Sequence, residues 1–171
     1  MFLLIDEKDY RELFKSLLRS YYEDVFEETV EEIFSNSKVN KENFAKLLSA
    51  LCGVEVDYSH NFSEELNKAI ENYQMSNKVV VKTDSCVTHC IEVDGKTICQ
   101  STCPFDAIIL GKDDEIEVDM DSCVGCGLCI DTCEKKNFVD KIEFMPLFEL
   151  LRNKETVIAA VAPAIVGQFG E

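Results

Sequence analysis

The chain has 171 residues, enough for one or two small domains. Its 33 acidic residues against 17 basic ones give a formal net charge of −16, which argues against binding to nucleic acid, because phosphate backbones require clustered Lys and Arg. The acidity suits a soluble protein that docks on a basic partner surface, but plain solubility explains it equally well.

Signals for export or membrane insertion are not evident. The apolar run at the N-terminus is short, has no basic residue before it and is followed at once by acids. The longest apolar run, residues 157–166, contains Pro163 and is far shorter than the ~20 residues of a membrane helix. Nine cysteines without an export signal predict a cytoplasmic protein in a reducing, oxygen-poor cell, with no membrane contact.

Residues 1–77 predict a small helical domain of unknown role. Apolar side chains recur at three-four spacing in four stretches, residues 10–21, 22–34, 44–52 and 62–73. Asn40 is the expected N-cap of the third helix, with Gly53 past its end, and Asn61 with Glu64 resembles a capping box. Cys52 falls on an apolar helix face, so we expect a buried free thiol there.

Polar residues of this domain are expected at its surface. His60 lies in a polar connector, and the acidic pairs Glu27-Glu28 and Glu31-Glu32 suggest a solvated helix face, with docking as a lesser alternative. No residue of this part of the chain suggests catalysis.

A first set of cysteines follows residues 78–83, which predict a strand. The set comprises Cys86, Cys90, Cys99 and Cys103, and Cys103 is followed by Pro104. Alternating residues around Asp94-Gly95 predict a small hairpin with a type I′ turn, inserted inside this cysteine loop. His89 also lies in the loop. It could replace a thiolate, although we expect a loop residue beside the site.

A second set forms a regular run, Cys123-x2-Cys126-x2-Cys129-x3-Cys133. Before it, residues 104–109 predict a short helical turn and residues 115–119 a strand; after it, residues 139–144 predict a closing strand. Gly125 and Gly127 suit a tight loop, because glycine reaches positive φ without a Cβ penalty. The apolar side chains expected to enclose the sites are Phe105, Ile108, Ile109, Ile116, Val118, Ile130 and Phe138.

The second run has the ligand spacing of a bacterial 4Fe–4S cluster, whose fourth cysteine ligates the other cluster in two-cluster ferredoxins. The crossed scheme predicts two 4Fe–4S clusters. Their ligands would be Cys86, Cys90, Cys99 and Cys133 for cluster 1, and Cys123, Cys126, Cys129 and Cys103 for cluster 2. Zinc and disulfides are the alternatives, and the triple short spacing counts against zinc. Glu134 stands where proline usually follows, which predicts a looser turn after Cys133 and a carboxylate that disfavours reduction of cluster 1.

The last segment, residues 146–171, predicts a helical connector over 146–154 and then a strand over 157–161. A continuous apolar strand belongs in a buried parallel sheet, so we expect this segment to open a further domain. The fold class is therefore α+β: a helical domain (1–77), a ferredoxin-like two-cluster domain (78–145), and a connector with the first strand of a truncated catalytic domain (146–171).

In residues 78–171 the chain resembles the iron-only (FeFe) hydrogenases. The resemblance rests on the two cysteine sets followed by Val161-Ala162-Pro163-Ala164. It implies an electron-input module that passes low-potential electrons between an external ferredoxin-like carrier and a hydrogenase-like catalytic domain. The family's catalytic-cluster ligands lie in cysteine motifs that these 171 residues lack, so no catalytic residue is expected and the chain should not turn over hydrogen by itself.

Three other functions remain open. A stand-alone ferredoxin-like carrier would fold residues 155–171 back to bury their apolar side chains. A redox-sensing regulatory module would use the irregular first loop to change how the helical domain docks. A purely structural metal site would show no redox activity.

Overall fold

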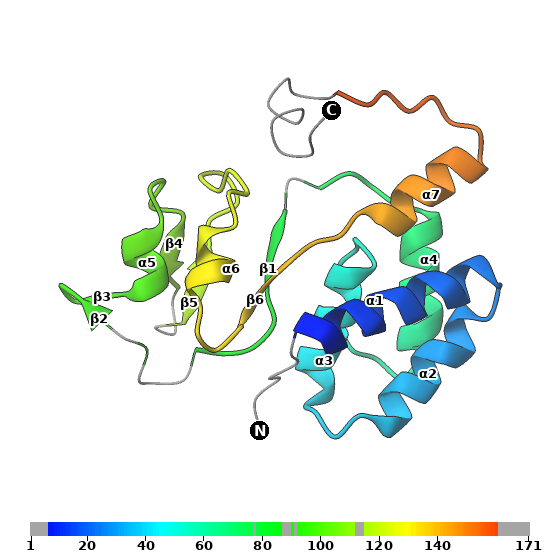
Figure 1. Cartoon of the computed structure of the whole chain (residues 1–171), viewed down its shortest axis with the longest axis horizontal. Helices are drawn as coiled ribbons and strands as arrows, with labels where there is room; N and C mark the ends of the chain where they lie inside the picture. The colour runs from blue at the N-terminus through cyan, green and yellow to red at the C-terminus, as the bar shows by residue number, and fades with distance from the viewer. Residues whose placement is uncertain (1–6, 77, 87–89, 91, 112–114, 161–171) are drawn as a thin grey trace.

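The computed structural model describes residues 7–76, 78–86, 90, 92–111 and 115–160, and it mixes helices with small antiparallel sheets. Figure 1 shows α1–α4 and α7 gathered on one side and β2–β5, α5 and α6 on the other, with β1 and β6 running between them. No helix in these ranges has both the length and the apolar character needed to cross a bilayer.

The four predicted helices of the N-terminal part are confirmed. They are α1 (Glu7–Tyr22), α2 (Phe26–Asn36), α3 (Lys41–Leu51) and α4 (Phe62–Glu71). Their apolar faces meet in one core, in which Leu17, Leu48 and Leu66 are fully buried. Burial of side chains of this size contributes about 1.5–3 kcal/mol each, which stabilises helices too short to persist alone in water.

The helix starts differ from one another in their chemistry. Asn40 caps α3 as predicted, its side chain accepting a hydrogen bond from the Asn43 amide at 2.9 Å. The capping box expected at Asn61 is wrong, since its side chain makes no capping hydrogen bond. Glu64, which would complete that box, instead forms an ion pair with Lys68 one turn along the helix.

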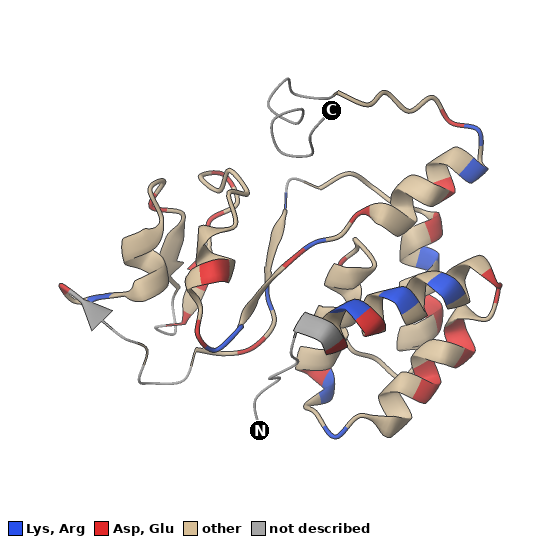
Figure 2. Cartoon of the chain, in the orientation of Figure 1, with Lys and Arg blue, Asp and Glu red and all other residues tan. Residues whose placement is uncertain are grey.

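The acidic face of α2 is largely solvated, as predicted. Figure 2 shows acidic residues along this helix. Glu28, Glu31 and Glu32 are exposed, and Glu27 is half-buried. Glu27 and Glu31, however, accept hydrogen bonds from α4, from the Asn67 amide at 3.0 Å and the Ser63 hydroxyl at 3.1 Å. These two acids therefore help to hold α2 against α4.

A helix from the far end of the described chain completes the helical core. α7 (Phe144–Arg152) packs against α4, and Met145 is fully buried in the core. The closing strand predicted over residues 139–144 is wrong in its second half, because β6 is Phe138–Asp140. Met145 and Phe148, three residues apart, both face the helical core, which favours a helix here over an extended strand.

The cysteine-bearing part contains two similar units, each with a pair of antiparallel strands and a short helix. β1 (Val80–Lys82) pairs with β6, with Val81 opposite Val139. β4 (Ile108–Leu110) pairs with β5 (Ile116–Val118), with Ile109 opposite Glu117. A short helix precedes the last cysteine of each set, α5 (Ile98–Thr102) before Cys103 and α6 (Leu128–Thr132) before Cys133.

The predicted hairpin inside the first cysteine loop is present. β2 (Glu92–Val93) pairs with β3 (Lys96–Thr97), and the two turn residues, Asp94 and Gly95, have φ of 53° and 76°. Two central residues at positive φ are what a type I′ turn requires.

The helical turn predicted over residues 104–109 is wrong. Helix α5 lies before Cys103, where Thr97 and Gln100 form a capping box that starts it. Pro104 and Phe105 then form a turn, and Ile108 enters β4, where its buried side chain lies opposite Val118. Burial and strand pairing of Ile108 outweigh the helical spacing of this apolar stretch.

The strand predicted over residues 157–161 is not found where the chain is described. Residues 157–160 belong to no strand and are exposed, Ile158 at 87%. An apolar strand needs a partner to satisfy its backbone groups, and none pairs with residues 157–160 in the described ranges. Val161, Pro163 and Ala164 lie outside the described residues. The domain limits 1–77, 78–145 and 146–171 stay a prediction.

Gly53 lies where the helical part of the chain contacts the segment between β6 and α7. It has φ of 74°, and a Cβ there would lie 2.7 Å from both Glu143 Cα and Ile142 O. Gly95 has φ of 76° but nothing within 4 Å of such a Cβ. We predict that Gly95→Ala costs about 1–2 kcal/mol of unfolding free energy from left-handed strain alone. Gly53→Ala should cost about 1–3 kcal/mol more, from overpacking.

Urea unfolding followed by circular dichroism, without oxygen, measures both variants. Equal losses for the two would contradict the close backbone contact between Gly53 and the segment before α7.

Candidate metal centre

Eight of the nine cysteines surround two separate cavities. One cavity is lined by Cys86, Cys90, Cys99 and Cys133, and the other by Cys103, Cys123, Cys126 and Cys129. These are the same two groups that the crossed scheme assigns to clusters 1 and 2. We call the two cavities site 1 and site 2. The identity of what they bind stays a prediction.

The exchange of Cys103 and Cys133 follows from the two short helices. Each cysteine is the C-cap of its helix, with nearly equal backbone angles, φ −76° and ψ 110° for Cys103 and φ −71° and ψ 102° for Cys133. Helices α5 and α6 pack against each other. The residue that ends each helix therefore reaches the site whose other cysteines belong to the opposite set.

Backbone amides donate to the sulfurs of both exchanged cysteines. The Ala107 amide donates to Cys103 Sγ at 3.3 Å, and the Asn137 amide donates to Cys133 Sγ at 3.4 Å. In each turn the residue before the donor has positive φ, 49° at Asp106 and 55° at Lys136. Such hydrogen bonds stabilise negative charge on a sulfur ligand and tune the reduction potential of a bound cluster.

Glu134 does not loosen the second turn. The Lys136 amide donates to the Cys133 carbonyl at 3.0 Å, whereas the corresponding bond from Asp106 to Cys103 is 3.4 Å. The expectation of a looser turn is thus wrong, because the positive φ at Lys136 closes the turn without proline.

The glycines of the second loop adopt the predicted conformation. Gly125 and Gly127 have φ of 67° and 79°. A Cβ at Gly125 would lie 2.6 Å from Val79 Cγ2, so close packing as well as backbone angle favours glycine there. His89, of the first loop, lies outside the described residues.

The enclosure of the two sites is unequal. Ile108, Ile116 and Phe138 are buried as expected, and Val118 and Ile130 pack partly buried against them. Phe105 lines site 2 as expected, although it is 47% exposed. Ile109 is wrong as an enclosing residue, since it is 41% exposed and lines neither site. Site 1 includes the buried Cys99 and Cys133, whereas Cys126 of site 2 is exposed.

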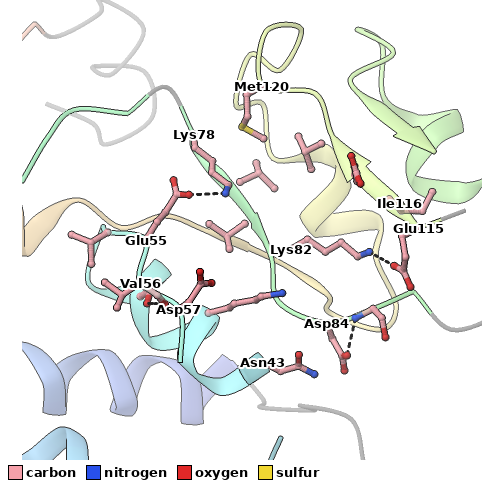
Figure 3. Close-up of a pocket in the computed structure, with 18 of the residues that line it drawn as sticks. Asn43, Glu55, Val56, Asp57, Lys78, Lys82, Asp84, Glu115, Ile116 and Met120 are labelled. Carbon is pink, nitrogen blue, oxygen red and sulfur yellow. Dashed lines mark hydrogen bonds and ion pairs between the residues drawn. The ribbon is translucent and has the colours of Figure 1, made fainter. Parts of the chain in front are cut away.

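An ion pair supports the first loop from a distant strand. Lys82 Nζ lies 2.5 Å from Glu115 Oε2, and the same carboxylate oxygen accepts a hydrogen bond from the Cys86 amide at 3.3 Å. The hydrogen bond and charge of Lys82 lower the pKa of the Glu115 carboxyl. The pair lines a cleft between α3 and the strands β1 and β5 (Figure 3). The volume of this cleft is about 1030 Å³. Sequence reasoning missed Glu115, because residues 33 positions apart give no local signal.

Two of these thiols, Cys86 and Cys129, have pKa values shifted toward the neutral form. Burial, followed by repulsion from Cys123, raises the pKa of Cys129 to about 11. Burial also raises the pKa of Cys86, an effect that Lys82 partly opposes. Since thiolates are the metal ligands, a metal that binds here would displace the protons of these thiols.

The donor sets fit 4Fe–4S clusters. Each cavity offers four thiols, one for each iron of a cube, and amide donors already face the sulfurs. In the described ranges, no three or more His, Cys, Asp or Glu side chains form a group that could hold a single metal ion.

Cys52 differs from the other eight cysteines. It is fully buried in the helical core, as predicted, and desolvation raises the pKa of its thiol well above the ordinary range.

The thiolate is the reactive form, so we predict that iodoacetamide at about pH 8 leaves Cys52 unmodified in the folded protein and labels it after unfolding in urea. Mass spectrometry of tryptic peptides measures the labelling. Rapid modification of Cys52 in the folded protein would contradict its placement.

Comparison with known proteins gives two partial matches. The chain is 44% identical over 41 residues to a subunit of the Na⁺-translocating ferredoxin:NAD⁺ oxidoreductase complex of Acetobacterium woodii, covering 24% of this chain and 12% of that protein. It is 31% identical over 90 residues to a component of the polysulfide reductase of Wolinella succinogenes, covering 48% of this chain and 47% of that protein. No protein-family model and no solved structure matches the chain.

The chain thus spans less than half the length of each of these relatives. Both relatives are components of oxidoreductases. At this coarse level the similarity supports an iron–sulfur electron-transfer protein, and it does not extend to a particular family.

Proposed function

We propose that this chain binds two 4Fe–4S clusters and transfers single electrons between redox partners. The observation that carries the proposal is the gathering of four cysteines around each of two cavities, one cysteine of each four coming from the opposite set. The similarity to components of two oxidoreductases supports the same reading.

The protein's contribution would be ligation, hydrogen bonding and exclusion of water. A bound 4Fe–4S cluster supplies reversible one-electron chemistry. The buried side chains of Phe138 at site 1 and Ile108 at site 2 line the sites with apolar atoms, which disfavours the added negative charge of reduction and lowers the potential. Exposure of Cys126 makes site 2 the more accessible point for exchange with an external carrier.

The finer proposal is an electron-input module of an FeFe-hydrogenase-like oxidoreductase. Its support is the resemblance of the cysteine sets and of the Val-Ala-Pro-Ala segment. The exposed apolar side chains of Val157 and Ile158, just before that segment, are consistent with a surface that a catalytic partner domain covers. A different oxidoreductase partner is equally compatible with the relatives found.

The second candidate is a stand-alone ferredoxin-like carrier. It requires residues 155–171 to fold back and bury their apolar side chains, and residues 155–160 are exposed. This observation favours a module that works within a larger redox assembly.

Anaerobic iron and sulfide analysis with EPR of the dithionite-reduced protein tests the proposal. We predict about eight iron atoms and eight sulfides per chain, with signals from two magnetically coupled cubes. Cys99→Ser should damage only the cluster of site 1 and Cys126→Ser only that of site 2, because these cysteines line different cavities.

The paired variants act as controls for each other. Zinc in place of iron, or two variants that both lose the same EPR signal, would contradict the proposal. If the wild-type protein contained only four iron atoms per chain, the proposal would be wrong for one of the two clusters.

A further inference from the structure

Asn137 connects three segments at site 1. Its backbone amide donates to Cys133 Sγ at 3.4 Å, and its carbonyl accepts from the Thr83 amide at 2.8 Å and the Thr83 hydroxyl at 3.3 Å. Its side-chain nitrogen donates to the Ser85 carbonyl at 3.2 Å and lies 3.9 Å from Cys86 Sγ, within range of a weak hydrogen bond to sulfur. Both Asn137 and Thr83 are buried.

The side-chain bonds of Asn137 have no counterpart in the other half. At the equivalent position Ala107 repeats the backbone bonds, with its amide donating to Cys103 Sγ at 3.3 Å and its carbonyl accepting from the Asp119 amide at 2.8 Å. A methyl side chain cannot donate a hydrogen bond. At this position the two halves therefore differ by one amide group, which faces a cysteine of site 1.

The side-chain amide of Asn137 matters because two cysteines of site 1, Cys86 and Cys133, lie far apart in the sequence. Cys86 enters on the loop after β1, while Cys133 arrives from α6. Asn137 bonds to both loops at once, so its amide fixes Cys86 relative to Cys133. A buried amide donor to sulfur also favours the reduced cluster, whose sulfurs carry more negative charge.

We propose that Asn137 is a positioning residue that holds Cys86 at site 1 and raises the reduction potential of cluster 1 relative to cluster 2. This inference rests on the proposed function, because it concerns the cluster that site 1 would hold. On this proposal, the two clusters differ in reduction potential partly because site 1 has Asn137 where site 2 has Ala107.

The test is the substitution Asn137→Ala in the full chain. It places alanine beside site 1, as Ala107 already is at the equivalent position beside site 2. Asn67→Ala is the matched control, because it deletes an amide hydrogen bond to Glu27 in the helical part, away from both sites. Anaerobic EPR redox titration measures both potentials, with the signal of cluster 1 identified as the one lost in Cys99→Ser. We expect the potential of cluster 1 to become more negative in Asn137→Ala, with cluster 2 unchanged and both clusters unchanged in Asn67→Ala.

A second measurement covers a variant that fails to hold cluster 1. Wild-type protein carrying asparagine labelled with ¹⁵N at the side-chain amide only should show a weak ¹⁵N hyperfine coupling on cluster 1 by pulsed EPR, and none on cluster 2. Unchanged potentials in an Asn137→Ala variant with its full iron content would overturn the inference, as would absence of this coupling. Wild-type protein without iron would instead overturn the proposed function, and with it the inference.

Discussion

The structure depends on the exchange of one cysteine between two similar halves. Each half supplies three cysteines to its own cavity, two from a loop and one from the short helix that follows. Its fourth cysteine, at the C-cap of that helix, lines the other cavity. This exchange requires α5 and α6 to lie against each other. It also requires β1 to pair with β6, although these two strands lie at opposite ends of the domain's sequence. Neither site is complete without residues from both halves, so a ligand that binds these thiols stabilises the folded domain as a whole.

The helical part is joined to this domain through the paired strands β1 and β6. Ile142, just after β6, donates its amide to the Ala50 carbonyl of α3 at 2.8 Å, and Gly53 allows the two backbones to approach closely. Helix α7 then places Met145 in the helical core. The chain thus enters the cysteine domain at β1, leaves it at β6 and returns to the helices, so the first and last strands of that domain are both anchored. Phe138 of β6 lines site 1 and Val80 of β1 lines site 2, which also includes the exposed Cys126.

Much of this arrangement could be predicted from residue spacing, because the signals are local. Four helices, the Asn40 cap, the Asp94-Gly95 hairpin and the left-handed glycines of the second loop all follow from side chains within a few positions of one another. The failures arise where distant contacts decide. Ile108 is in a strand because Val118 lies opposite, and residues 144–152 form a helix because they pack on α4. The grouping of cysteines required knowledge of the crossed ligand scheme, and spacing alone does not reveal that Asn137 or Glu115 supports the first loop.

The most direct test of the account exploits the two exchanged cysteines. In anaerobically reconstituted protein, Cys103→Ser and Cys133→Ser should each perturb the cluster of the opposite half: Cys103→Ser the same EPR signal as Cys126→Ser, and Cys133→Ser the same signal as Cys99→Ser. If Cys103→Ser instead altered the signal lost in Cys99→Ser, each half would hold its own four ligands, and the crossed architecture described above would be wrong.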